Sequence, residues 1–129
     1  MRPTAVARGA DKWLDVVRHP SPEACAKTLK ARGYRIFVAS MEGASAPENL
    51  LAEGPAAVIF GTEHSGVSET FRGIADGTFA VPMRGFVESL NVSVAAAVTF
   101  HAATLAKHHA LSHTAQRELL RSFLQRCTR

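Results

Sequence analysis

The sequence AAVIFGTEHSG, residues 56–66, is the stretch that decides the fold. Its first five residues form a continuous apolar run, which is typical of a strand buried on both faces of a parallel sheet. Gly61 follows the run directly, and a glycine there lets backbone amides approach a ligand closely because it has no Cβ. In open parallel sheets, ligands bind at the carboxyl ends of the strands. The loop over residues 61–66 is therefore the first candidate binding site.

The segments on either side of this stretch alternate between strand and helix patterns. Strands are predicted at residues 13–17, 34–39, 56–60 and 78–81, and helices at residues 22–31, 48–53, 69–75, 89–109 and 114–126. Ser21 and Pro22 are typical of a helix start, and Gly33 of a helix end. This alternation predicts an α/β domain with a parallel sheet and flanking helices.

The composition is that of one soluble domain, with 129 residues of which 47% are apolar and 20% charged. No apolar run approaches the ~20 residues of a membrane span, and the N-terminus lacks a signal-peptide core. We therefore expect a cytoplasmic protein with no membrane partner. Cys25 and Cys127 predict neither a disulfide framework nor a zinc site, and the histidines lack metal-ligand spacing, so no metal is expected.

Basic residues are concentrated at the two ends of the chain. Residues 1–36 hold eight Lys and Arg against three acids, and residues 101–129 hold five against one. The segment between them is acidic, with two bases against seven acids. Such basic ends indicate a polyanion partner, and nucleic acid is the usual one. The alternative is that these charges are the solvated faces of amphipathic helices.

A second polar loop follows the last predicted strand and runs into the long helix expected at 89–109. It reads PMRGFVESLN over residues 82–91, with Ser89 and Asn91 close to the helix start. Ser89 has an alternative role as the helix N-cap, and Glu63 of the first loop has one as a surface acid. The sequence contains no GxSxG elbow and no Walker loop, which argues against an α/β-hydrolase or a P-loop enzyme.

In this order the two loops closely resemble motifs 2 and 3 of the SPOUT RNA methyltransferases. The matching segments are AVIFGTEHSGVS at residues 57–68 and VPMRGFVESLNVSVA at residues 81–95. The segment GADKWL at residues 9–14 and the basic C-terminal helices resemble the TrmH branch, the tRNA guanosine 2′-O-methyltransferases. The resemblance covers nearly the whole chain and is strongest over residues 56–100.

The resemblance implies a parallel α/β sheet whose C-terminal segment is threaded through a loop as a trefoil knot. It also implies a homodimer, S-adenosylmethionine as methyl donor, and the ribose 2′-hydroxyl of an RNA, most directly a tRNA, as acceptor. Seven residues fall on the family's site positions, four for the cofactor (Gly61, Val81, Met83 and Leu90) and three for the active site (Glu63, Ser89 and Asn91). The small residues at 93 and 95–97 are expected at the dimer contact, with ordinary core packing as the alternative.

The family's first motif, an Asn followed by an Arg on the first helix, has no counterpart in this chain. The arginine is implicated in activating the ribose hydroxyl, and Arg2 and Arg8 lie in the segment that resembles the region after it. We therefore expect a partial methyltransferase domain at residues 1–109 with a basic helical extension at 110–129, the N-terminal part of the fold being absent.

Three functional hypotheses remain open at this point. The first is a tRNA or rRNA ribose 2′-O-methyltransferase, with weak or absent activity in this chain alone. The second is a non-catalytic remnant that binds S-adenosylmethionine or RNA and dimerises. The third, outside the family, is a plain nucleotide-binding α/β domain that prefers ATP or NAD.

Overall fold

The computed structural model describes residues 13–84, 90–106 and 111–127 and divides the chain into two compact units. The larger unit, residues 19–108, contains the sheet. The smaller unit combines residues 1–18 with residues 109–129. The domain boundary expected between residues 109 and 110 stays a prediction.

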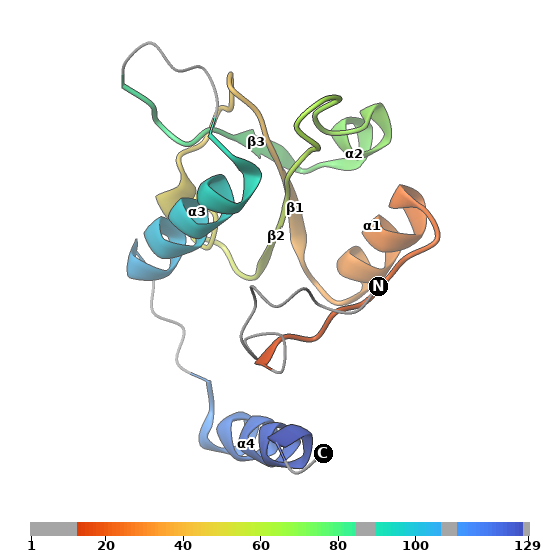
Figure 1. Cartoon of the computed structure of the whole chain (residues 1–129), viewed down its shortest axis with the longest axis vertical. Helices are drawn as coiled ribbons and strands as arrows, with labels where there is room; N and C mark the ends of the chain where they lie inside the picture. The colour runs from red at the N-terminus through yellow and green to blue at the C-terminus, as the bar shows by residue number, and fades with distance from the viewer. Residues whose placement is uncertain (1–12, 85–89, 107–110, 128–129) are drawn as a thin grey trace. The chain divides into compact units, whose positions relative to one another are not determined.

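A three-stranded parallel sheet forms the centre of the larger unit, in the order β2-β1-β3. The strands are β1 (Arg35–Ala39), β2 (Ala56–Ile59) and β3 (Gly77–Phe79). Phe37 in the middle of β1 pairs with Val58 on one side and Gly77 on the other. Because all three strands are parallel, their carboxyl ends meet at one edge of the sheet (Figure 1). The predicted α/β class and parallel sheet are confirmed.

Helices cover both faces of this sheet. Figure 1 shows α1 (Pro22–Ala31) and α2 (Glu69–Ile74) on one side, and α3 (Val92–Ala106) with the short 3-10 helix η3 (Pro47–Asn49) on the other. α1 begins and ends as predicted: the Ser21 hydroxyl accepts the Ala24 amide at 3.2 Å, and Gly33 takes φ +78° after the last turn. A buried cluster of Phe37, Leu50, Phe79 and Ala103 joins the sheet to η3 and α3.

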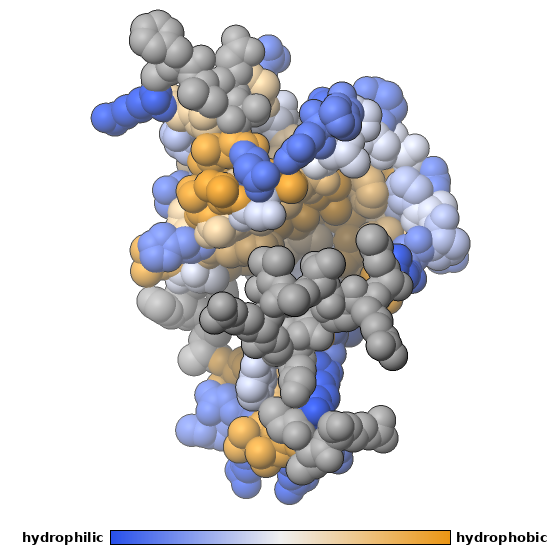
Figure 2. Space-filling view, in the orientation of Figure 1, coloured by the Kyte–Doolittle hydropathy of each residue, from blue (hydrophilic) through white to orange (hydrophobic). Residues whose placement is uncertain are grey.

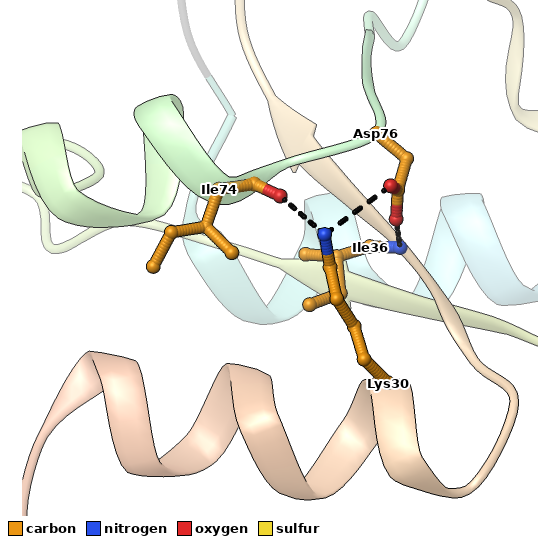
Figure 3. Close-up of polar contacts among 4 residues, drawn as sticks. All are labelled: Lys30, Ile36, Ile74 and Asp76. Carbon is orange, nitrogen blue, oxygen red and sulfur yellow. Dashed lines mark hydrogen bonds and ion pairs between the residues drawn. The ribbon is translucent and has the colours of Figure 1, made fainter.

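Asp76 ties β1 to the start of β3, as Figure 3 shows. Its carboxylate accepts the Ile36 amide at 2.8 Å, and its own amide donates to the Ile36 carbonyl at 2.8 Å. Lys30 of α1 donates to the Ile74 carbonyl at 3.0 Å and lies 3.4 Å from the carboxylate. The hydrogen bond from Ile36, reinforced by the charge of Lys30, holds the pKa of Asp76 below its ordinary value. One carboxylate thus joins α1, β1 and β3.

The strand predicted at residues 13–17 is wrong. The segment pairs with no strand among the described residues, and its apolar side chains remain exposed, Val16 to 77%. Trp13 instead packs edge-on against Phe123 of α4 (His113–Cys127), with 4.8 Å between ring centroids. Arg126 of the same helix pairs with Asp15. A short apolar run forms a strand only where a neighbouring ladder is available, and here a helix offers the contact.

Other predicted bounds move without changing the element type. The helix predicted at 48–53 is only the three-residue η3, followed by turns. β3 starts one residue early and ends at Phe79, before Pro82, while the apolar run of β2 is half-buried rather than covered on both faces. α3 begins at Val92 rather than near residue 89. None of the described helices has the length and apolar character needed to cross a membrane.

Candidate functional site

Three loops and one helix start gather at the carboxyl edge of the sheet. The chain leaves β1 into residues 40–46, β2 into residues 60–68, and β3 into residues 80–84. The start of α3 lies at the same end of the unit (Figure 1). Because helices cover both faces of the sheet, this edge is where loop backbone and loop side chains remain accessible to a ligand.

The loop after β2 closes on itself over residues 62–66. The Thr62 amide donates to the Gly66 carbonyl at 3.0 Å, and the Gly66 amide donates to the Thr62 carbonyl at 2.9 Å. The Thr62 and Ser65 hydroxyls share a hydrogen bond of 2.6 Å, and the Ser65 amide donates to the Thr62 hydroxyl. Gly66 sits at φ +64°, a conformation that favours glycine. The loop therefore has a defined shape held by its own atoms.

Gly61 permits this closure. A Cβ built on Gly61 lies 2.0 Å from the carbonyl carbon of Gly66 and 2.4 Å from its oxygen, far inside any real contact. The space beside Gly61 is thus taken by the backbone of its own loop. The absence of a side chain at this position, which predicted a close approach of a ligand, allows a close approach of two backbone segments.

Glu63 and Asn91 lie in different loops, 28 positions apart in the sequence, and a hydrogen bond joins them. The Asn91 side-chain amide donates to a Glu63 carboxylate oxygen at 3.3 Å. The Asn91 side-chain oxygen accepts the Ser93 amide at 2.9 Å, and its backbone oxygen accepts the Ala95 amide at 2.9 Å. Asn91 therefore caps α3, which is why the helix begins at Val92. The second active-site candidate of that loop, Ser89, lies outside the described residues.

Apolar side chains lie on the segments that follow β3 and precede α3. Val81 packs partly buried against the core cluster. Met83 and Leu90, on either side of the gap in the described parts of the third loop, keep 37% and 36% of their surface accessible. Arg84 is exposed. The edge therefore combines accessible apolar side chains, backbone donors and acceptors, and one carboxylate held by an amide.

Sequence reasoning missed Arg72, which contacts the closed loop from α2. Its Nε donates to the Val67 carbonyl at 3.2 Å, immediately after the loop. The spacing of Glu69 and Arg72 is the ordinary i, i+3 pattern of an exposed helix and gave no signal for this second contact. Within the described parts of the chain, no group of three or more His, Cys, Asp or Glu side chains is placed to hold a metal ion.

Comparison with known proteins finds similar sequences and structures among RNA methyltransferases. A tRNA (guanosine(18)-2′-O)-methyltransferase of Thermus thermophilus is 42% identical over 91 residues, which cover 70% of this chain and 47% of that relative. The TrmH/SpoU tRNA modifying enzyme of A. aeolicus has a similar structure, with a TM-score of 0.75 and 25% identity over 95% of this chain and 67% of that one.

A third similar protein is the SpoU methyltransferase AviRb of Streptomyces viridochromogenes, solved in complex with AdoMet. Its TM-score is 0.59 at 27% identity, covering 69% of this chain and 36% of that one. The chain spans about half the length of the curated relatives it matches. Residues 2–101 match the model of the SpoU rRNA Methylase family. The chain accordingly belongs to this family.

Proposed function

We propose that this chain carries the cofactor-binding part of an S-adenosylmethionine-dependent tRNA ribose 2′-O-methyltransferase. The observation that carries the proposal is the hydrogen bond between Asn91 and Glu63, which joins the two family motifs at the carboxyl edge of the sheet. The Thermus thermophilus relative, named for 2′-O-methylation of a tRNA guanosine, supports the reaction class. AviRb, solved with AdoMet, supports the cofactor.

The residues at this edge fit S-adenosylmethionine. A flat adenine needs accessible apolar side chains, which Met83 and Leu90 offer, and polar backbone groups for its edge. Gly61 and Val81 would contribute backbone atoms at the ends of β2 and β3, because each lies two residues beyond the last residue of its strand. A loop that already holds its shape lowers the ordering cost of binding.

When bound, S-adenosylmethionine supplies a methyl group on a sulfonium centre that a ribose 2′-hydroxyl can attack. The residues of this chain orient that hydroxyl. Glu63 uses one carboxylate oxygen for Asn91, and its other oxygen has no hydrogen bond within the described residues and can accept the ribose O–H. Asn91 fixes the carboxylate, and α3 fixes Asn91. Aligning the attacking hydroxyl with the sulfonium methyl contributes a large part of the rate acceleration in an in-line methyl transfer. Ser89 is proposed as a third active-site residue from its motif position.

Calorimetric titration with S-adenosylmethionine, ATP and NAD tests the cofactor. We expect saturable binding of S-adenosylmethionine and weaker or no binding of the other two. Leu90→Asp should weaken binding at least about tenfold, because it places a charge among the apolar contacts. Leu119→Asp, at a leucine of α4 that is 38% exposed against 36% for Leu90, is the matched control and should bind as the original chain does. Tighter binding of ATP or NAD would replace the proposal by a plain nucleotide-binding domain.

The proposed acceptor, a tRNA, is supported by a basic ridge on α4. His113, Arg117 and Arg121 follow one another four positions apart, so they share one face of the helix, and all three are exposed. Transfer of labelled methyl groups to tRNA, with the product mapped to a 2′-hydroxyl, tests the reaction. Binding of cofactor and tRNA without any transfer, in a chain extended to the length of its relatives, would favour a non-catalytic binding module.

We further propose that two copies of this chain associate through α3. Figure 2 shows apolar residues gathered over this helix. Val94, Val98 and Leu105 fall on one exposed stripe of α3, at 47%, 41% and 60% exposure, with Ala97 between them. The helix carries no Asp, Glu, Lys or Arg. Sedimentation should give a dimer that Val98→Glu converts to a monomer, and a monomer in the unmodified chain would overturn this assignment.

We also propose that the chain after β3 is threaded as a trefoil knot. Support comes from the loop after β1, which lies tightly against the exit from β3. A Cβ on Gly43 would lie 2.0 Å from the Phe79 carbonyl carbon, and the Ser45 amide donates to the Thr78 carbonyl at 3.1 Å. Stretching single molecules tests the threading, because a knot shortens the contour length after unfolding. A full 129-residue contour length would refute it.

A further inference from the structure

The loop that carries Glu63 is fixed at its two ends by different means. Its first end continues from β2, whose residues are hydrogen-bonded into the sheet. Its second end is Val67, which is 6% exposed and leads into α2. α2 has only six residues, none of them buried. A helix this short is marginal by itself, so the second end of the loop needs another attachment.

Arg72 supplies that attachment. Its side chain reaches back along α2, and its Nε donates to the Val67 carbonyl at 3.2 Å. Its backbone amide donates to the Ser68 carbonyl at 3.1 Å, so the same residue holds the junction twice. The guanidinium also lies beside the turn itself: an Nη atom is 3.9 Å from the position of a Cβ on Gly66. Gly66 is the residue whose two hydrogen bonds with Thr62 close the loop.

The charge of Arg72 matters less than its donor. Its partner Glu69 lies 3.7 Å away and is 95% exposed, and ion pairs in such surroundings contribute little because water screens them. The hydrogen bond to Val67 is partly buried, and Val67 precedes the N-cap Ser68, so its carbonyl lies outside the intrahelical hydrogen bonds of α2.

We propose that Arg72 is a positioning residue, which braces the closed loop over residues 62–66 through the Val67 carbonyl and so keeps Glu63 facing Asn91. It acts through the loop and not by touching the cofactor. The expected effect of Arg72 on S-adenosylmethionine binding rests on the proposed function, whereas its effect on the loop does not.

Three substitutions separate the donor from the charge. In Arg72→Gln, the side-chain amide nitrogen is the same number of bonds from Cα as Nε of arginine, so the donor is kept and the charge is lost. Arg72→Met keeps a chain of similar length with neither. Glu69→Gln removes the ion pair and leaves the donor, and serves as the control.

Amide hydrogen exchange of Thr62 and Gly66 in the ligand-free chain is the first readout. We expect exchange to rise about threefold to tenfold in Arg72→Met, the range that the net value of one hydrogen bond gives, and to change less than twofold in Arg72→Gln and Glu69→Gln. S-adenosylmethionine affinity, the second readout, should fall in the same order. Arg72→Gln thus tests rescue by a neutral donor, which a purely electrostatic role would not show.

Two results overturn the inference. One is unchanged exchange at Thr62 and Gly66 in Arg72→Met. The other is equal acceleration in Arg72→Gln and Arg72→Met, which would assign the effect to charge. If Arg72→Met also speeds exchange at the amide of residue 72, α2 has unravelled in that variant. The test then depends on Arg72→Gln, whose exchange at Thr62 and Gly66 must stay within twofold of the original chain. Absence of S-adenosylmethionine binding in the original chain would reject the proposed function alone, because the exchange comparison needs no ligand.

Discussion

Replacing Asp76 by alanine should destabilise the larger unit by removing an acceptor from a buried donor. Ile36 is completely buried, and its amide donates to the Asp76 carboxylate at 2.8 Å. Without that oxygen the amide of this buried residue loses its acceptor, and an unsatisfied buried donor costs about 1–3 kcal/mol. The ion pair with Lys30 adds less than about 1 kcal/mol, because both side chains are more than a third exposed. We expect a loss of roughly 2 kcal/mol in total.

Urea unfolding at neutral pH measures this loss, with Lys30→Met and Asp76→Asn as companions. Lys30→Met removes the ion pair and the contact with the Ile74 carbonyl but leaves the acceptor, and should cost under about 1 kcal/mol. Asp76→Asn keeps an oxygen for the Ile36 amide and should fall between the other two. A cost below about 0.5 kcal/mol for Asp76→Ala, or a larger cost for Lys30→Met, would refute the reasoning.

The same carboxylate gives a pH dependence of known sign. The pKa of Asp76 is lower in the folded chain than its ordinary value of 3.8, chiefly because of the hydrogen bond from Ile36. The stabilisation is therefore complete above that ordinary value and is lost as the pH falls through the lower, folded pKa. The stability difference between the original chain and Asp76→Asn should be constant near neutral pH and shrink below about pH 4. A difference that grows with acidity would contradict this assignment.

Four further substitutions test the site and its supports. Gly61→Ala should destabilise the loop by about 1–3 kcal/mol and abolish cofactor binding, because its Cβ overlaps Gly66; unchanged melting temperature and calorimetric affinity would count against the close packing. Asn91→Ala should cost about 1 kcal/mol through the lost cap of α3, whereas Glu63→Gln should alter thermal stability by less than about 0.5 kcal/mol; equal costs would deny Asn91 its capping role. Gly33→Ala should cost about 1 kcal/mol, since alanine is strained at φ +78°, and a stabilised variant in thermal melts would be inconsistent with that backbone.

Elements with strong local signals were predictable from the sequence. α1 has a capping serine, a proline at its first position and a glycine after its end, and it lies where predicted. The apolar run before Gly61 forms β2 because it can pair with β1. The strand predicted at residues 13–17 failed because a strand also depends on a partner, which no local pattern specifies. The start of α3 was misplaced because two capping residues, Ser89 and Asn91, compete within three positions.

The candidate site was predictable as residue identities and less so as contacts. Motif order brought Glu63 and Asn91 into one hypothesis, and the structure joins them by a hydrogen bond. The sequence did not indicate that Asn91 serves α3 and Glu63 at once. Nor did it indicate Arg72 or the pairing of Asp76 with Ile36, because side-chain hydrogen bonds to distant backbone depend on the assembled fold.

The contact between Gly61 and Gly66 restricts which substitutions this loop can accept. Where a large side chain clashes with its neighbour, a second-site change to a smaller residue often restores the fit. Here the opposing surface is backbone. A side chain at position 61 would overlap the backbone atoms of Gly66, and no substitution at position 66 makes those atoms smaller. A genetic screen for suppressors of a Gly61 substitution should therefore return only reversion to glycine at that position or changes that rebuild the whole turn.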